Sequence, residues 1–281
     1  MIESQISKDY CQLLNEVEQG NKTENDIQNF LEIHSEFIPD NFLLNHGLHF
    51  KMAITKLQFG DYVCDFCTIS KSTVEWNVNL IELEKPVKIY NALNPDVSPN
   101  TAFNKGLNQI QNWRTAIEKN DSILKNAIRP FLKPDSMADN RILVKYTLVI
   151  GRQKELDACG RNRDDFYARS TDSFKIMTFD SLQKHAEECS SPKNILSYSL
   201  RKVKVKQMNR KNLGSMLAHF HNEELSIDEA IKKKLRDDGY DIDAWENGEL
   251  LVVNGKLPIS KSDEICDAVG NCIHNTSALG N

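Results

Sequence analysis

Three kinds of sequence feature are missing, and each absence excludes a class of protein. No apolar run approaches the roughly 18 residues that a membrane-crossing helix needs. The first residues, MIESQISKDY, are polar and lack the apolar stretch of a secretory signal. The seven cysteines are scattered and odd in number, which does not fit a disulfide framework. These absences predict a cytoplasmic protein without a membrane partner.

The net charge of −5 gives no overall indication of nucleic-acid binding, but the charges are unevenly placed. Residues 1–48 contain nine acids and two bases, whereas residues 201–211 contain six bases and no acid. In the second segment, Lys202, Lys204 and Lys206 alternate and would share one face of a strand. Such a row can contact phosphates, yet lysines also protect sheet edges against aggregation, and the sequence favours neither role.

The spacing of apolar residues predicts an α/β order of elements. The expected elements are helices at 1–20 and 24–38, strands at 48–58, 62–69 and 76–84, a helix at 103–117, a strand at 141–150, a helix at 164–168, a strand at 174–178 and a helix that Asp180 caps. This order implies a mixed sheet with helices on its faces. We expect an N-terminal helix over 1–20, one domain over 21–190, and a C-terminal appendage over 191–281 with a basic strand and helices near 213–222 and 227–236.

Three acidic residues stand on two neighbouring predicted strands. Asp65 is the only charged residue in an otherwise core-like run, and burying an unpaired carboxylate costs several kcal/mol, so a cation should compensate it. Glu82 and Glu84 are two residues apart, so they share one strand face with Cα atoms roughly 6.5 Å apart. If the strands pair, all three carboxylates converge at one end of the sheet. Hard oxygen ligands of this kind suit Mg²⁺ or Mn²⁺.

A divalent cation at this place would activate a water molecule and stabilise the charge that builds on a scissile phosphate. This is the logic of the Asp…Glu-x-Lys nuclease site. Here Glu84 occupies the usual lysine position, and Lys85 comes one residue later. Lys85 should point to the opposite strand face from Glu82 and Glu84, so its part in steadying the attacking group stays open.

Two further residues fit the same site. Glu24, in the first turn of the helix before the sheet, could add a carboxylate, although the helix dipole already explains an acid there. Gln109 lies four residues before Trp113 and shares its helix face, where a glutamine could bind a phosphate or a metal-bound water. Trp113 itself is expected in the core rather than against a base.

Six stretches of the chain together resemble the Shedu family of bacterial antiphage-defence proteins. The matching stretches, in family order, are Glu24 to Glu32, Tyr62 to Phe66, Ile81 to Pro86, Gln109 to Arg114, Leu148 to Arg152 and Thr178 to Leu182. No single stretch is diagnostic, but the ordered set is fairly specific and covers about residues 21–190. Residues after 190 lie outside the clear resemblance.

The resemblance implies a restriction-endonuclease-like α/β domain that cleaves or nicks double-stranded DNA through backbone contacts, as a homo-oligomer (dimer or tetramer). Asp65, Glu82 and Glu84 would bind the metal, with Gln109 and Lys85 assisting and Glu24 as an additional ligand. Arg152 matches a basic residue of the family that would lie near the nucleic acid.

Two other interpretations stay open. The chain could be a nuclease fold that has lost cleavage and senses DNA ends or a phage factor, which the displaced lysine favours. It could also be a structural or partner-binding protein in which Asp65 is simply paired with a neighbouring base. A zinc site at Cys64 and Cys67 is disfavoured, because no second pair follows at a usable spacing and strand positions three apart face opposite ways.

Overall fold

The computed structural model describes residues 4–90, 98–188, 191–209, 213–253, 255–258 and 260–261. The strands are β1 (Met52–Phe59), β2 (Tyr62–Lys71), β3 (Glu75–Leu83), β4 (Arg141–Val149), β5 (Phe174–Met177), β6 (Asn194–Ser199), β7 (Lys202–Gln207) and β8 (Leu225–Ser226). The helices are α1 (Gln5–Glu18), α2 (Glu24–Ile33), α3 (Thr101–Lys119), α4 (Ser122–Ile128), α5 (Gln153–Asp157), α6 (Gly160–Ala168), α7 (Phe179–Glu188), α8 (Gly214–Leu217), α9 (Glu229–Asp237) and α10 (Ile242–Glu246).

In the described residues the strands form one mixed sheet in the order β5-β4-β3-β2-β1-β6-β7-β8. The first three strands are an antiparallel meander. β4 runs parallel to β3, and β5 runs parallel to β4. β6 adds in parallel to β1 on the other side. The prediction of a mixed sheet with helices on its faces is confirmed.

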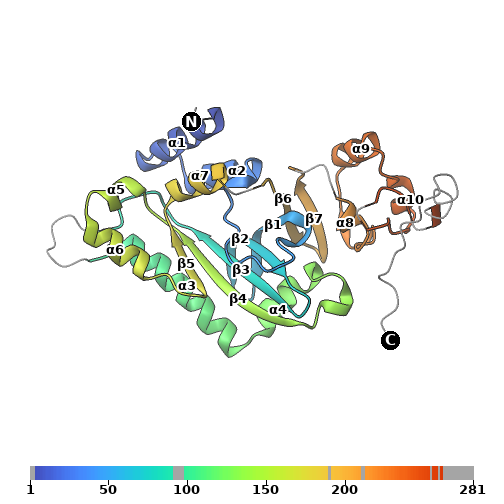
Figure 1. Ribbon diagram of the computed structural model, residues 1–281, viewed down its shortest axis with the longest axis horizontal. Helices are drawn as coiled ribbons and strands as arrows, with labels where there is room; N and C mark the ends of the chain where they lie inside the picture. The colour runs from blue at the N-terminus through green and yellow to red at the C-terminus, as the bar shows by residue number, and fades with distance from the viewer. Residues whose placement is uncertain are drawn as a thin grey trace.

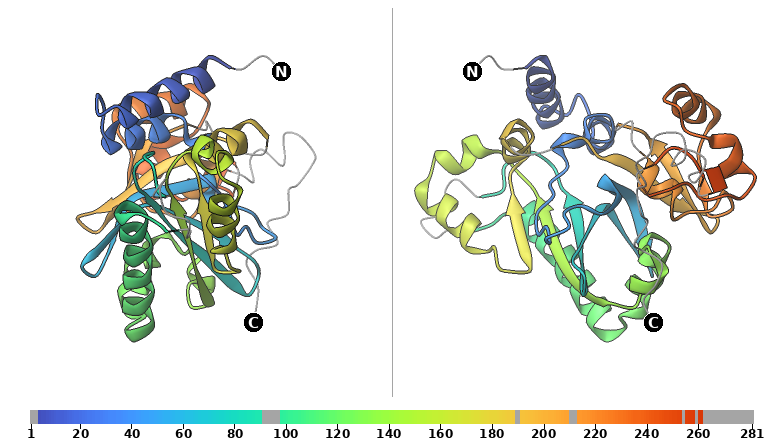
Figure 2. Two further views of the ribbon diagram at one scale, coloured as in Figure 1. Left: turned by 90° about the vertical axis from the view of Figure 1, so that its left-hand side faces the viewer. Right: turned by 45° about the vertical axis from the view of Figure 1, so that its right-hand side comes forward.

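Helices cover both faces of this sheet (Figure 1). α1, α2 and α7 lie on one side, where Tyr10, Ile27 and Phe179 pack against sheet residues such as Ile81. α3 and α4 lie on the other side, and α3 is also separated from α1 and α2 in both views of Figure 2. Each helix repeats apolar residues at helical spacing, so one side of it enters the core while the other stays in water.

The start of α7 differs from the prediction by two residues. The helix begins at Phe179, and the hydroxyl of Thr178 accepts a hydrogen bond from the backbone N–H of Ser181 at 3.2 Å. Thr178 therefore performs the capping that we expected of Asp180. Asp180 lies in the first turn instead, where its carboxylate is free to bind Arg152.

The C-terminal part continues the same sheet. β6 pairs with β1, and β7 and β8 follow it, so the boundary expected at residue 190 falls between α7 and a strand of the common sheet. α8, α9 and α10 lie beyond β7 (Figure 1). The helix expected at 213–222 is shorter than predicted: α8 begins at Gly214 and ends at Leu217. Within the described ranges, no helix is both long and apolar enough to cross a bilayer.

Candidate active site

Glu82 and Glu84 lie where β3 ends, on the sheet face that α3 covers. Trp76, Val78 and Leu80, at the alternate positions before them, belong to the core cluster under α3. Alternation carries the same side-chain direction on to the two glutamates. Both are nearly buried, with 8% and 5% of their surface exposed. Two carboxylates therefore stand side by side beneath a helix.

Asp65 reaches the same region because β1 and β2 share a break in their regular structure. The hairpin register places Lys56 opposite Asp65, between two regularly paired positions. Lys56 has a φ of +48°, in the left-handed region that residues other than glycine seldom adopt. Non-glycine residues held in that region are concentrated at functional sites.

The break shifts which side chains face the core. Ile54 and Leu57 are three residues apart on β1, yet both belong to the core cluster under α3. Cys64 and Cys67 show the same spacing on β2 and are buried in that cluster as well. The assumption that Cys64 and Cys67 face opposite ways was therefore wrong, because it took β2 to be a regular strand. Burial raises the pKa of both thiols.

The carboxylate of Asp65 has two protein partners. β2 and β3 pair regularly as far as Phe66 and Ile81, and just beyond that pair the backbone N–H of Leu83 donates to Asp65 Oδ2 at 2.7 Å. Asp65 Oδ1 forms an ion pair with Lys56 Nζ. Lys56 is thus the cation that burial of Asp65 requires.

α3 supplies two polar side chains to the glutamates. Gln109 Nε2 donates to Glu82 Oε1 at 2.5 Å, and Lys105 Nζ lies 3.2 Å from Glu84 Oε1. The helix can come this close because Gly106 stands between them. A Cβ at that position would lie 3.1 Å from Glu84 Cγ.

Glu24 and Lys85 lie at the margin of the cluster. Glu24 Oε1 and Lys85 Nζ are 3.9 Å apart, which makes a weak surface pair. Glu24 is nevertheless close enough to raise the pKa of Glu84 electrostatically. Lys85 lies beyond the last residue of β3, and its ion pair is with Glu24.

The crowding of carboxylates changes their protonation. Burial, followed by the charges of Asp65 and Glu84, raises the pKa of Glu82 to about 9. Burial also raises the pKa of Glu84, although the hydrogen bond and charge of Lys105 oppose this shift. Glu82 therefore carries a proton at neutral pH unless a cation approaches it.

The residues fit a hard divalent cation in chemistry. Every candidate ligand is a carboxylate oxygen, which Mg²⁺ and Mn²⁺ prefer, and a cation would relieve the repulsion that protonates Glu82. As the side chains lie in the described residues, no three of them from histidine, cysteine, aspartate or glutamate surround a common point. Asp65 is bound to Lys56 and Glu84 to Lys105 instead.

Arg152 is not on the surface. It is 7% exposed and donates to Asp180 at 3.0 Å and to Asn15 at 3.1 Å, with Glu18 at 3.4 Å. These contacts join α1 to the first turn of α7. The guanidinium is thus taken up by a structural ion pair, and its expected contact with nucleic acid stays a prediction.

The row of lysines on β7 divides into two groups. All three lysines are exposed, as a phosphate contact requires, and Lys206 differs from Lys202 and Lys204 by its acidic partner. Lys206 Nζ lies 2.7 Å from Oε2 of Glu32, a nearly buried residue of α2 that also accepts a hydrogen bond from Thr55 at 2.7 Å. Lys206 therefore compensates a buried charge between α2 and the sheet.

Sequence reasoning missed Lys56 and Lys105. The sequence contains enough information to place both. Lys105 is four residues before Gln109 and therefore shares its helix face. The two-residue turn at Gly60 and Asp61 sets the hairpin register, which places Lys56 opposite Asp65. The left-handed backbone of Lys56 had no such signal, because lysine has no local preference for it.

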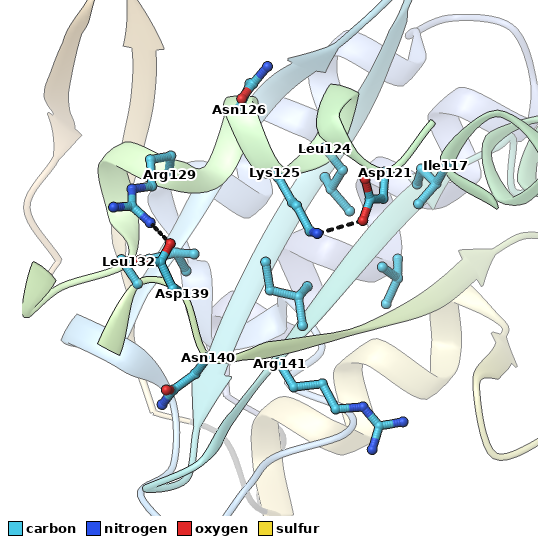
Figure 3. A pocket seen from close by; sticks show the side chains of 13 residues that line it. Ile117, Asp121, Leu124, Lys125, Asn126, Arg129, Leu132, Asp139, Asn140 and Arg141 are labelled. Atoms are coloured by element: carbon cyan, nitrogen blue, oxygen red, sulfur yellow. Dashed lines mark hydrogen bonds and ion pairs between the residues drawn. The ribbon is translucent and has the colours of Figure 1, made fainter. Parts of the chain in front are cut away.

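A cavity of about 560 Å³ lies elsewhere in the molecule, between α4 and the start of β4 (Figure 3). Arg129 and Asp139 form an ion pair at 2.5 Å among its lining residues. Arg141 opens β4 opposite Glu75, seven residues before Glu82 on β3, or about 23 Å along the strand. The cavity is thus separate from the carboxylates.

The fold and the cluster define a mixed α/β protein with buried carboxylates at the end of a central strand. The family profile described as "Shedu protein SduA, C-terminal" matches residues 21–183, which is more than half of the chain. The chain therefore belongs to the Shedu family, and this membership implies a role in antiphage defence. The match runs from just before α2 into α7 and so includes every residue of the cluster. No curated protein matches the chain.

Proposed function

We propose that the protein is a metal-dependent deoxyribonuclease that cuts or nicks phosphodiester bonds during antiphage defence. The observation that carries the proposal is Glu82, a buried carboxylate whose pKa is raised to about 9 beside Asp65 and Glu84. Strongly shifted carboxylates beside like charges are typical of functional sites. Membership of the Shedu family supplies the biological setting.

Asp65, Glu82 and Glu84 would hold Mg²⁺ or Mn²⁺, with Glu24 as an outer carboxylate. The bound ion would supply Lewis-acid stabilisation of the scissile phosphate and favour ionisation of the attacking water. Gln109 orients Glu82 through its 2.5 Å hydrogen bond. Lys56 pairs with Asp65 and Lys105 with Glu84 in this structure. When the substrate binds, each lysine would leave its carboxylate partner and contact the phosphate, where its charge offsets the negative charge of the transition state. Lys85, paired with Glu24, is the third lysine in reach of the cluster.

The test is incubation of the purified protein with supercoiled and linear DNA in Mg²⁺, in Mn²⁺ and in chelator. Wild type should cut or nick only with metal, and Asp65→Ala should abolish cutting. Asp139→Ala is the matched control, because Asp139 is an exposed acid near the other end of the sheet. Cutting without metal, or equal cutting by Asp65→Ala, would refute the assignment of the site.

A second candidate function is a DNA-sensing module without cleavage. The observation in its favour is that lysines already pair with Asp65 and Glu84. This alternative expects DNA binding that survives in chelator, no thermal stabilisation by Mn²⁺, and no cutting in any buffer. The nuclease proposal expects Mn²⁺ to stabilise wild type and to have little effect on Asp65→Ala.

We also propose that the protein acts as a homo-oligomer, on the basis of its family alone. Light scattering of the full chain during size-exclusion chromatography would test this, since a mass near 32.1 kDa means a monomer.

A further inference from the structure

A stripe of asparagines runs along α3 beside the candidate active site. Asn104, Asn108 and Asn112 recur every four residues and are all exposed, so they share one outer face of the helix. Asn104 donates to the carbonyl of Pro99 at 3.2 Å. In the part of the chain that the structure describes, the amides of Asn108 and Asn112 have no hydrogen-bond partner. Each can donate to a ligand and accept from one.

The stripe forms one wall of an open groove of about 590 Å³. The facing wall is the tip of the β1–β2 hairpin, through Asp61, Tyr62 and Val63. Val63 is 44% exposed although it is a β-branched strand residue. The groove thus has amides on one side, and Tyr62 and Val63 beside the carboxylate of Asp61 on the other.

The groove opens from the carboxylate cluster. Lys105 and Gln109 line it, and the same two side chains bind Glu84 and Glu82. From there it continues along α3 toward the hairpin tip. A polymer with one phosphate at the carboxylates would therefore have its neighbouring units in the groove.

The charge of the groove suits one strand rather than a duplex backbone. Among the residues that line it, the charged ones are Lys105 and Asp61, which cancel. Surfaces that bind duplex DNA neutralise several phosphates with lysine and arginine. An unpaired strand presents base edges and faces, which amides and apolar side chains can bind.

We propose that this groove binds an unpaired nucleic-acid strand that adjoins the scissile phosphate. The inference rests on the proposed function and deepens it, since it names the form of the substrate: DNA with a flap, an overhang or a single-stranded segment. Asn108 and Asn112 contact this strand and take no part in the reaction itself.

The test measures binding in chelator, so that no cutting is needed. Fluorescence anisotropy compares the full chain with Asn108→Ala/Asn112→Ala and with the control Gln111→Ala, an exposed residue of α3 outside the groove. The ligands are a blunt DNA duplex, the same duplex with an overhang, and single strands of DNA and of RNA. The double variant should bind overhang and single strand about 10-fold more weakly, because it loses two hydrogen-bonding side chains, and should bind the blunt duplex like wild type.

Three results would overturn the inference: unchanged affinity of the double variant, an equal loss for blunt duplex, or no binding of any ligand by wild type. Wild type that cuts DNA but binds independently of the asparagines overturns this inference alone. Asparagine-dependent strand binding by a protein that never cuts overturns only the nuclease proposal. Comparison of the DNA and RNA strands shows which polymer is preferred.

Discussion

Lys56 of β1 forms an ion pair with Asp65 of β2 across a point where both strands lose their regular alternation. The lysine adopts a left-handed backbone there, with a φ of +48°. The same pair compensates the partly buried carboxylate of Asp65, which also accepts a hydrogen bond from the backbone N–H of Leu83 at the end of β3. The loss of alternation in β1 and β2 and the position of the Asp65 carboxylate in the site thus involve the same pair of residues.

The left-handed backbone of Lys56 can be tested with two substitutions. Lys56→Ala and Lys56→Gly both remove the ammonium group, so they differ mainly in the backbone that they favour. Glycine adopts a positive φ without a steric penalty, so Lys56→Gly should be about 1 kcal/mol more stable than Lys56→Ala. Urea unfolding of both variants measures the difference. In a regular strand alanine would be the more stable of the two, and that order would show that the turn of the backbone is absent.

The protonation of Glu82 predicts how stability depends on pH. Its pKa is about 9 in the folded protein, against 4.5 for an unperturbed glutamate. Between these values the folded state binds more protons than the unfolded state, so stability falls as pH rises from about 5 to about 9. In chelator, the melting temperature of wild type should fall over this range on the order of 5 °C more than that of Glu82→Gln.

Glu82→Gln is the suitable comparison because it keeps the shape of the side chain and can still meet Gln109. Differential scanning fluorimetry from pH 5 to 9 records both profiles. Parallel profiles would mean that Glu82 ionises normally, and Glu82 would then be less buried, or further from Asp65 and Glu84, than the structure places it.

Local spacing was enough to find most of the cluster. Two glutamates at alternate strand positions and a glutamine on the next helix could be assigned from period, and the aspartate from its place in an otherwise core-like run. The hydrogen bond from Gln109 to Glu82 joins two of these assignments directly.

Contacts between residues far apart in the chain could not be found in this way. Arg152 stands just after a strand, as a substrate-binding base often does, yet its partners come from α1 and α7. Lys206 belongs to an alternating basic run, but Glu32 of α2 binds it. Periodicity describes which face a side chain takes and contains no information on the element that will cover that face.

Gly106 is expected to be needed for the close approach of α3 to β3. A Cβ at this position would lie 3.1 Å from both Glu84 Cγ and Leu148 Cδ1. Alanine normally stabilises a helix interior by about 1 kcal/mol relative to glycine, whereas overpacking costs about 1–3 kcal/mol. Gly106→Ala should therefore lose about 1 kcal/mol of stability and displace Glu84 from Lys105.

Gly160→Ala provides the matched control, because nothing lies within 4 Å of a Cβ placed there. Guanidinium unfolding should show it equal to wild type or slightly more stable. If Gly106→Ala behaves in the same way, α3 lies further from the sheet than these distances state.

Arg152 and the β7 lysines Lys202 and Lys204 are expected to affect different measurements: Arg152 the stability of the protein, and the lysines the salt dependence of DNA binding. Arg152→Ala leaves Asp180 without its main cation and breaks the link to α1, so it should cost about 2 kcal/mol of stability and leave DNA affinity unchanged. Lys202→Ala/Lys204→Ala removes two exposed charges and should not change stability. If these lysines contact phosphates, the double variant should lower the slope of log affinity against log salt by about 2.

The two measurements are independent, and that allows each role to be refuted separately. Urea unfolding of Arg152→Ala measures how much the ion pair contributes to stability. A stability equal to wild type would contradict the structural role and favour the contact with nucleic acid that the family resemblance implies.

Affinity for duplex DNA at several salt concentrations tests Lys202 and Lys204. An unchanged slope would mean that Lys202 and Lys204 do not contact phosphates, since the slope counts released counterions whatever the sequence of the DNA. Lys206→Ala distinguishes the two kinds of lysine on the same strand: because it uncovers the nearly buried Glu32, it should lower stability by about 1–2 kcal/mol without changing the salt slope.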